Sequence, residues 1–193
     1  MKTIITTLFL FFVTTTFSQD SVVHYYNEIA GKSEYGDSSH NFVKWKNDVK
    51  IFFDFENNDS IKEYTKIIIN ELNNLIDPIT ISIVKDKKEA NTFIYFCDFS
   101  EYKKRANITI NGKFLGFVGT VVYQSRIYTS HIFINERLRG IELKSVLREE
   151  ITQSLGLMND SWKYPESVFY QGGCNTNKFS EIDKAIIKLH YNK

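Results

Sequence analysis

The sequence predicts an α+β fold, in which helices cover a mixed β-sheet, and two observations support this class. A strand-like stretch and an amphipathic helix come early in the chain, three or four strand-like stretches follow, and two helices come last. Helices that follow a run of strands pack together on one sheet. The composition agrees, since 42% of the residues are hydrophobic, 15% are aromatic and only 2 are proline, as in a folded chain.

The first half of the chain is expected to hold two helices and one strand. Residues 22–30 are expected to form a short first helix, which a polar loop with glycine and serine follows. β-branched and aromatic residues with partial alternation predict a strand over residues 43–55. The run Asn58-Asp59-Ser60 has the character of a helix cap, so a second helix is expected from Ile61 to just before Pro78.

The second half is expected to supply most of the sheet and the last two helices. Strands are expected at residues 79–84, 92–99, Gly116–Tyr123 and Arg126–Asn135, the last two as an antiparallel pair around Gln124 and Ser125. A helix is expected over about residues 142–157, a loop over 158–164 and a last helix over about 180–190. Ser180, with Asp183 three residues later, fits a helix-capping pair.

Residues 1–18 have the three parts of a cleavable signal peptide. Lys2 gives the positive start, residues 4–13 give an apolar core, and Thr16-Phe17-Ser18 places small residues at the two positions that a signal peptidase inspects. We therefore expect cleavage before Gln19 and export to the periplasm or out of the cell. The apolar core is shorter than the roughly 20 residues that span a bilayer, so a membrane anchor is the weaker interpretation.

Residues 19–193 are expected to form one monomeric domain without a membrane span. This length is enough to bury a sizeable core. The chain has 24 basic and 23 acidic residues, and the balance is even once Lys2 leaves with the signal peptide. Such a balance gives no reason to expect a nucleic acid or an anionic membrane as the partner.

The two cysteines, Cys97 and Cys174, are open to two interpretations. In an oxidising compartment they could form one disulfide. Equally, one could be a buried thiol and the other a loop thiol that never meet, because the sequence does not give the distance between them.

The helix over about residues 142–157 carries a carboxylate within its apolar face. At about 100° per residue, Leu147, Ile151 and Leu155 share one stripe, and Glu150 falls beside Leu147 inside the apolar arc. A buried carboxylate is costly unless it is paired, protonated or given hydrogen-bond donors. Glu150 is therefore either a structural group that holds a donor or a functional group that lines a cleft.

The stretch from Glu149 to Asn159 resembles the active helix of the metzincin zinc proteases, in which His-Glu-x-x-His is followed by x-x-Gly-x-x-His. Glu150 matches the general-base glutamate, and Gly156, within Leu-Gly-Leu, matches the glycine at which the chain turns. Glu149, Gln153 and Asn159 stand where the three histidine ligands would be. The resemblance implies a metzincin-like fold with a degenerate metal site, Glu-Glu-x-x-Gln in place of His-Glu-x-x-His.

The resemblance extends to other parts of the chain. Residues 164–170 are similar to the turn under the metzincin zinc, with Phe169 in the place of the methionine, and residues 179–191 are similar to the closing helix. Residues 45–55 and 128–135 resemble two strands of that fold, which also implies an N-terminal backing helix. The Glu-Glu-x-x-Gln helix with its Leu-Gly-Leu-Met-Asn-Asp continuation further resembles a bacterial domain-of-unknown-function family, number 2927, which shares the degenerate site.

Standard zinc proteolysis is not expected, because the matched positions hold no histidine and zinc in proteases needs imidazole or thiolate ligands. Oxygen atoms of Glu149, Gln153 and Asn159 or Asp160 could instead hold a divalent cation such as Ca²⁺, Mg²⁺ or Mn²⁺. The alternative, which we prefer, is no metal and no other cofactor: these side chains and Glu150 would then form a hydrogen-bonded network that ties the helix to the turn near Ser167. The residues expected at this site are Glu149, Glu150, Gln153, Asn159, Asp160, Ser167, Phe169 and Tyr170.

The resemblance also implies a groove for an extended peptide. In the resembled fold, an exposed edge strand beside the active helix pairs with the substrate by β-augmentation. Gly116–Tyr123, in which Gly119 allows close approach, is the expected edge strand. An ordinary hairpin strand is the other interpretation.

Three functions are compatible with these observations. The one we expect is an exported metzincin-like protein without catalysis, which binds an extended peptide or an envelope protein, or acts as a scaffold. The second is an active peptidase-type hydrolase with an oxygen-ligated metal or a carboxylate-only site, in which Glu150 is the general base. The third is an envelope or extracellular interaction protein whose degenerate site is purely structural.

Overall fold

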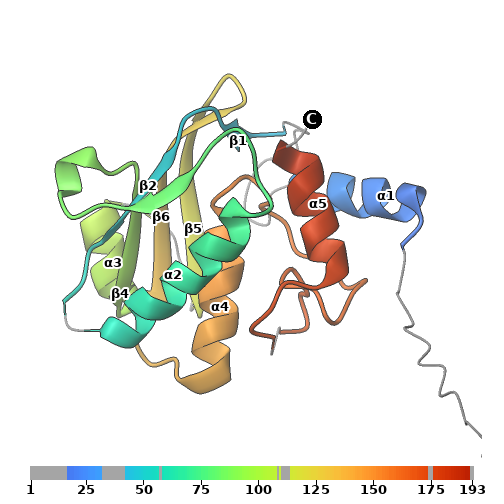
Figure 1. Ribbon diagram of the computed structural model, residues 1–193. Helices are drawn as coiled ribbons and strands as arrows, with labels where there is room; N and C mark the ends of the chain where they lie inside the picture. The colour runs from blue at the N-terminus through green and yellow to red at the C-terminus, as the bar shows by residue number, and fades with distance from the viewer. Residues whose placement is uncertain are drawn as a thin grey trace, which may run out of the picture.

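The computed structural model describes residues 17–31, 42–56, 58–107, 109, 114–173 and 176–191. Figure 1 shows the chain in these residues as a sheet with helices on both faces and a helical region beside it. The elements are α1 (Gln19–Ala30), β1 (Lys44–Trp45), β2 (Val49–Phe53), α2 (Asp59–Asn73), β3 (Ile81–Ile83), the 3-10 helix η1 (Lys87–Glu89), β4 (Thr92–Cys97), α3 (Phe99–Ala106), β5 (Gly116–Tyr123), β6 (Arg126–Asn135), α4 (Gly140–Gln153) and α5 (Glu181–Tyr191).

The sheet is mixed, as the sequence predicted. Strands β1, β6, β4, β2 and β3 run parallel in that spatial order, and β5 is antiparallel to β6. β5 pairs with β6 along its whole length, so β4 and β1 share the other side of β6. Within the described residues, β5 therefore forms one edge of the sheet and β3 the other.

The β5–β6 hairpin confirms the expected antiparallel pair. Its turn residues, Gln124 and Ser125, both have positive φ, at 48° and 58°. A two-residue turn with this backbone matches the right-handed twist of the flanking strands. The short turn fixes the register, in which Tyr123 lies opposite Arg126.

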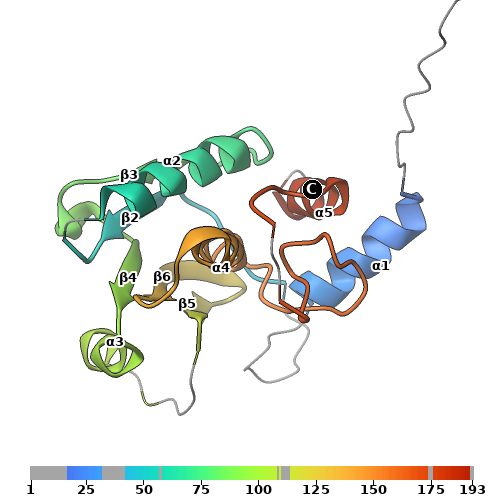
Figure 2. The same cartoon turned by 90° about the horizontal axis from the view of Figure 1, so that it is seen from below.

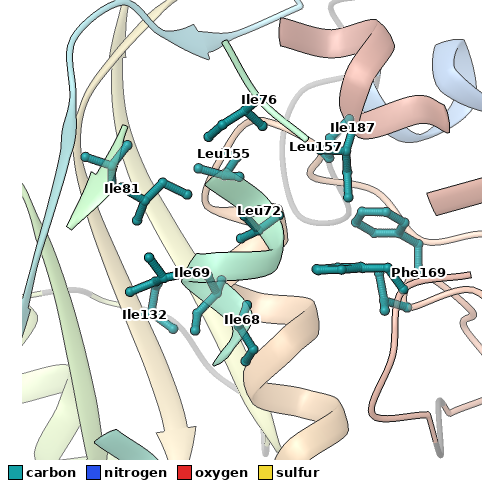
Figure 3. Packing of buried hydrophobic residues seen from close by; sticks show 14 of the residues in the cluster. Ile68, Ile69, Leu72, Ile76, Ile81, Ile132, Leu155, Leu157, Phe169 and Ile187 are labelled. Atoms are coloured by element: carbon teal, nitrogen blue, oxygen red, sulfur yellow. The ribbon is translucent and has the colours of Figure 1, made fainter. Parts of the chain in front are cut away.

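Helices cover the two faces of the sheet unequally. Figure 2 shows α2 and α4 on one face and the shorter α3 on the other, while α5 and α1 lie beyond α4. Alternate residues of the strands fill the two layers: Ile94 and Ile132 join the large core under α2 and α4, whereas Tyr95 and Phe133 pack against Tyr102 of α3. In Figure 3, side chains of α2, of the segment after α4 and of α5 meet in the large core.

Several expected elements have other bounds in the structure. The helix expected over about residues 142–157 is α4, which ends at Gln153, and the strand expected over residues 92–99 ends at Cys97, because α3 begins at Phe99. The single strand expected over residues 43–55 is two strands, because the chain bends at Lys46–Asp48 and changes partner from β6 to β4 and β3. The helix expected to continue to Pro78 ends at Asn73, whose side chain bonds both the N–H and the carbonyl of Ile81 at 2.8 Å. An asparagine that binds the next strand in this way stops the helix before the proline can.

Helix α3 is the one α-helix that the sequence interpretation missed. Asp98 caps it, accepting a bond from the Ser100 N–H at 2.8 Å, and Glu101 follows three residues after the cap. This Asp-x-x-Glu pattern is a capping signature that was available in the sequence. The aromatic residues around it favoured a continuation of strand β4 instead.

The segment expected to be a signal peptide falls largely outside the described residues, which begin at Phe17. Ser18 is the N-cap of α1, accepting a bond from the Ser21 N–H at 3.3 Å, so the helix starts three residues before the expected position. No helix in the described ranges is both long and apolar enough to cross a bilayer. Cys97 is buried, whereas Cys174 lies outside the described residues, so the disulfide and the pair of separate thiols both stay predictions.

Candidate functional site

The site lies at the C-terminal end of α4, which its apolar stripe fixes against the core. Leu147, Ile151 and Leu155 are buried, as the helical spacing predicted. The chain then turns at Gly156, where φ is +107°. A Cβ at Gly156 would overlap the Val43 carbonyl oxygen and lie 2.9 Å from Nε2 of His190. Only glycine fits this close crossing, which agrees with the role expected from the Leu-Gly-Leu motif.

The carbonyl groups at the end of α4 are satisfied by side chains from distant elements. Trp45 donates its indole N–H to the Ser154 carbonyl at 2.9 Å, and the Tyr191 hydroxyl donates to the Leu155 carbonyl at 2.8 Å. Nε2 of His190 lies 3.2 Å from the same Leu155 oxygen. Burial lowers the pKa of His190 to about 4, so its ring is neutral at pH 7. These bonds fix the end of α4 and therefore the positions of the side chains that precede it on the helix.

Glu150 lies beneath the start of the edge strand. Its side chain is only 7% exposed. A Cβ built on Gly116 of β5 would overlap Oε1 of Glu150 and lie 2.6 Å from both Cγ of Glu150 and Cγ1 of Val146. The carboxylate therefore occupies the space that a β5 side chain would otherwise fill. Glycine at position 116 is what allows the helix to bring this group so close to the edge of the sheet.

Of the residues at the three positions matched to metal ligands, Gln153 and Asn159 both bond Asp160. Gln153 donates its amide Nε2–H to Oδ1 of Asp160 at 2.9 Å. Asn159 donates its amide Nδ2–H to two backbone carbonyls, that of Glu28 at 3.2 Å and that of Asp160 at 2.9 Å. The Asn159 backbone N–H also bonds the carbonyl of Ile29, at 3.1 Å. Asn159 thus fastens this loop to the end of α1, and Asp160 is the bonded neighbour of Gln153.

Ser167 is the centre of a buried network between three segments. Its hydroxyl donates to Asp183 at 2.5 Å, lies 2.8 Å from the Tyr25 hydroxyl and accepts the Phe169 N–H at 3.1 Å. Asp183 also accepts bonds from the Val168 N–H and from the N–H and hydroxyl of Ser180, at 3.2, 2.8 and 2.7 Å. Burial raises the pKa of Asp183 against these bonds. The network ties the turn to α1 and α5.

Phe169 and Tyr170 have different environments. Phe169 is fully buried in the core, with Leu157 and Ile187 in the same cluster (Figure 3). The Tyr170 backbone forms a parallel β-bridge with Ser161. Its ring packs edge-on against that of Trp162, with 5.8 Å between the ring centroids. Trp162 is 65% exposed, so this aromatic pair lies at the surface of the protein.

Arg148 is a buried cation on α4 that the sequence interpretation missed. Its guanidinium bonds Glu71 of α2 and the Tyr64 hydroxyl, the latter at 3.2 Å, and lies 4.4 Å from the centroid of the Phe179 ring. An arginine within an apolar arc was the available signal, but its carboxylate partner is 77 residues away along the chain. These contacts of Arg148 join α4 to α2 on the side of α4 that faces away from β5.

The edge strand β5 runs beside this site. Its sequence, GFVGTVVY, has no charged residue and no proline. The Thr120 hydroxyl lies 3.9 Å from Sδ of Met158, so the loop after α4 meets the middle of the strand. Toward the turn, Val121 and Tyr123 are 56% and 63% exposed. Natural sheets usually protect an edge with charges, proline, a short strand or a bulge, and of these β5 has only the register shift between Val121 and Val122.

The donor atoms at the site do not fit the zinc ion of metzincin proteases. Glu149, Gln153 and Asn159 offer carboxylate and amide oxygens, and Asn159 is turned toward backbone carbonyls. No group of three or more histidine, cysteine, aspartate or glutamate side chains in the described part of the chain is arranged to hold a metal ion. The site therefore supports no step through zinc.

The structure, in which α4, the Gly156 turn and β5 lie beside a mixed sheet, is of the α+β class, as expected. The solved structure of myroilysin has a similar fold, with a TM-score of 0.51 at 10% identity, over 78% of this chain and 86% of that one. The chain belongs to the family described as "Protein of unknown function (DUF2927)", which matches residues 19–193. A second myroilysin structure matches with a TM-score of 0.48 at 13% identity, over 83% of this chain and 88% of that one. No curated protein matches the chain.

Proposed function

We propose that this chain is an exported, non-catalytic peptide-binding protein that uses a metzincin-like scaffold to hold an extended peptide along β5. The observation that carries the proposal is the edge strand itself. β5 is uncharged, pairs only with β6 among the described strands and lies directly against α4 and Met158. Such an edge is a template for one more strand, whose backbone would supply affinity and whose alternate side chains would supply specificity.

The chemistry of the α4 side chains favours binding over catalysis. The positions that would ligate zinc hold one carboxylate and two amides, Glu149, Gln153 and Asn159. The two amide nitrogens are engaged in bonds within the protein, to Asp160 and to backbone carbonyls. Glu150, against Gly116, then stiffens the floor under the edge strand.

A strand-pairing test uses a library of random ten-residue peptides presented to the purified chain. Selected peptides are expected to bind with β5, and Val121→Lys with Val122→Lys is expected to weaken them by about tenfold or more, because charges on the edge disfavour a neutral partner strand. The matched control is Val23→Lys, an exposed valine on α1, which should leave binding unchanged. Equal weakening by the control, or no selected peptide at all, would reject the proposal.

The rival function is a peptidase-type hydrolase with an oxygen-ligated metal or a carboxylate-only site. Asp160, bonded to Gln153 and near Glu149 in sequence, is the observation that favours it, since carboxylate oxygens suit Mg²⁺, Ca²⁺ or Mn²⁺. Elemental analysis would support it if the purified chain held a stoichiometric metal that Glu149→Ala removes. Cleavage of a quenched peptide library that Glu150→Gln abolishes, and Glu142→Gln on the exposed first turn of α4 does not, would establish it.

A further inference from the structure

The α3 face of the sheet carries a row of three rings on three strands in register, and a glycine on a fourth strand continues the row. Phe52 of β2 lies opposite Phe93 of β4, Phe93 opposite His131 of β6, and His131 opposite Gly119 of β5. The Phe93 and His131 rings are stacked, with centroids 5.3 Å apart and planes 19° from parallel. Lys87 lies over both phenylalanine rings, at 6.0 and 5.9 Å. The Lys87 ammonium group therefore lies at one end of the row, and Gly119 of the edge strand lies at the other.

The ring at the end of this row is held in place and is uncharged. The Tyr95 hydroxyl lies 3.0 Å from Nδ1 of His131, and the Tyr95 ring stacks beside it with planes 21° from parallel. Burial and the nearby Lys87 lower the pKa of His131, which favours the neutral imidazole at pH 7. The imidazole is thus stacked with Phe93 and Tyr95, and its cross-strand neighbour on β5 is Gly119.

Gly119 leaves a place for one more side chain at the end of the row. Among the described residues, the atoms nearest to a Cβ at Gly119 are Cε1 of Phe117 at 3.5 Å and the hydroxyl of Tyr102 at 3.8 Å, which are ordinary contact distances. Period-two alternation puts Phe117 and Val121 on the same face of β5 as Gly119. The place is thus bordered by His131 across the strand, by Phe117 and Tyr102 on one side and by Val121 on the other.

We infer that the peptide bound at β5 carries an aromatic residue opposite Gly119, and that its ring lies over this glycine and extends the stack that ends at His131. The inference rests on the proposed strand pairing and adds the class of ligand. A residue on an added strand lies directly beside the opposite residue of β5 on the same face of the sheet. Where that opposite residue is a glycine, an aromatic side chain can cover its backbone. Phe117, Val121 and the neutral imidazole supply the apolar and stacking contacts that a phenyl, phenol or indole ring prefers.

The test compares a selected ten-residue peptide with versions in which each aromatic residue is replaced by alanine. One of these replacements is expected to weaken binding about tenfold. Gly119→Val places two methyl groups where the ring would lie, and it should abolish this tenfold preference while the alanine peptide binds as before. His131→Ala should reduce the preference, and His24→Ala, an exposed histidine on α1, should not. Melting temperatures of the variants check that each one folds.

The outcomes separate the inference from the proposed function. Peptides that bind β5 with no aromatic position, or an aromatic preference that survives in Gly119→Val, overturn the inference and leave strand pairing standing. A library from which no peptide is selected overturns the proposed function and, with it, the ligand. An aromatic preference lost in Gly119→Val and reduced in His131→Ala supports both.

Discussion

At the residue scale, two glycines determine how α4 and the turn after it pack against neighbouring segments. Gly156 lets the chain cross beneath Val43, and Gly116 lets Glu150 reach the edge strand. The first is visible in the sequence as part of a Leu-Gly-Leu turn motif. The second is not, because its meaning depends on a helix residue that is 34 positions later and touches it only in the fold. A glycine's packing role is hidden in a sequence whenever its neighbour is distant.

Gly156→Ala is predicted to lower the free energy of unfolding by about 3–5 kcal/mol, because the methyl group meets the Val43 carbonyl oxygen and φ is +107°. Urea unfolding measures the change. Gly140→Ala is the matched control: φ there is +58° with nothing within 4 Å, so a cost of about 1 kcal/mol is expected. Similar costs for the two variants would contradict the close crossing.

Gly116→Ala and Glu150→Ala are predicted to be coupled. Each change alone should destabilise the fold, the first by forcing the Glu150 side chain away from β5 and the second by leaving a space under it. In the double variant the new methyl group enters that space, so at least about 1 kcal/mol of the summed cost should be recovered. A double-mutant cycle from urea unfolding gives this number. Strict additivity would mean that the two residues are not in contact.

His190 predicts a pH dependence of stability. Its folded pKa of about 4 lies below the ordinary 6.5, so as pH falls through this window the unfolded chain takes up a proton that the folded chain does not. Stability present above pH 6.5 is therefore lost toward pH 4, on the order of 3 kcal/mol from this group. His190→Gln should flatten the profile relative to His24→Gln. Asp183 acts in the opposite direction because burial raises its pKa, so the comparison between variants is what isolates the histidine.

At the scale of elements, sequence patterns located most helices and strands but not their connections. The β5–β6 pair and the Ser180–Asp183 cap follow from local rules, and both are present. The break between β1 and β2 could not be predicted, since it reflects the insertion of β4 beside β6. The pair of buried Arg148 and partly exposed Glu71 joins two helices far apart in the sequence, and single-helix periodicity contains no information on it.

Asp183→Asn tests the network that joins the 164–170 turn to α1 and α5. The carboxylate accepts four bonds, and an amide would set an N–H₂ group against donors, so the free energy of unfolding should fall by about 2–4 kcal/mol. Chemical denaturation followed by tryptophan fluorescence measures the change. Glu181→Gln, exposed in the same helix turn, should cost less than about 1 kcal/mol. If the two changes cost the same, Asp183 does not hold the turn.

At the scale of the whole molecule, the protein has a region fixed by buried hydrogen bonds, which we call the floor, and an edge strand beside it. The floor comprises the end of α4, the turn around Ser167 and α5, joined by buried hydrogen bonds. The edge is β5, which pairs with β6 alone among the described strands and has exposed side chains toward the turn. The sequence resemblance implied an edge strand beside the active helix, and β5 lies at an edge of the sheet among the described strands. A resemblance of residues could not predict the ring row on the α3 face, because cross-strand register belongs to the fold alone.

The most direct test is hydrogen–deuterium exchange of the purified chain with and without a saturating selected peptide, with the peptide's mass read in the same samples. Exchange in β5 is expected to become slower, because a paired strand protects the amides that face away from β6. The peptide is expected to keep its mass after prolonged incubation. Unchanged exchange in β5 with protection elsewhere would contradict the edge as the binding site. A shortened peptide, left intact by Glu150→Gln, would establish a hydrolase instead.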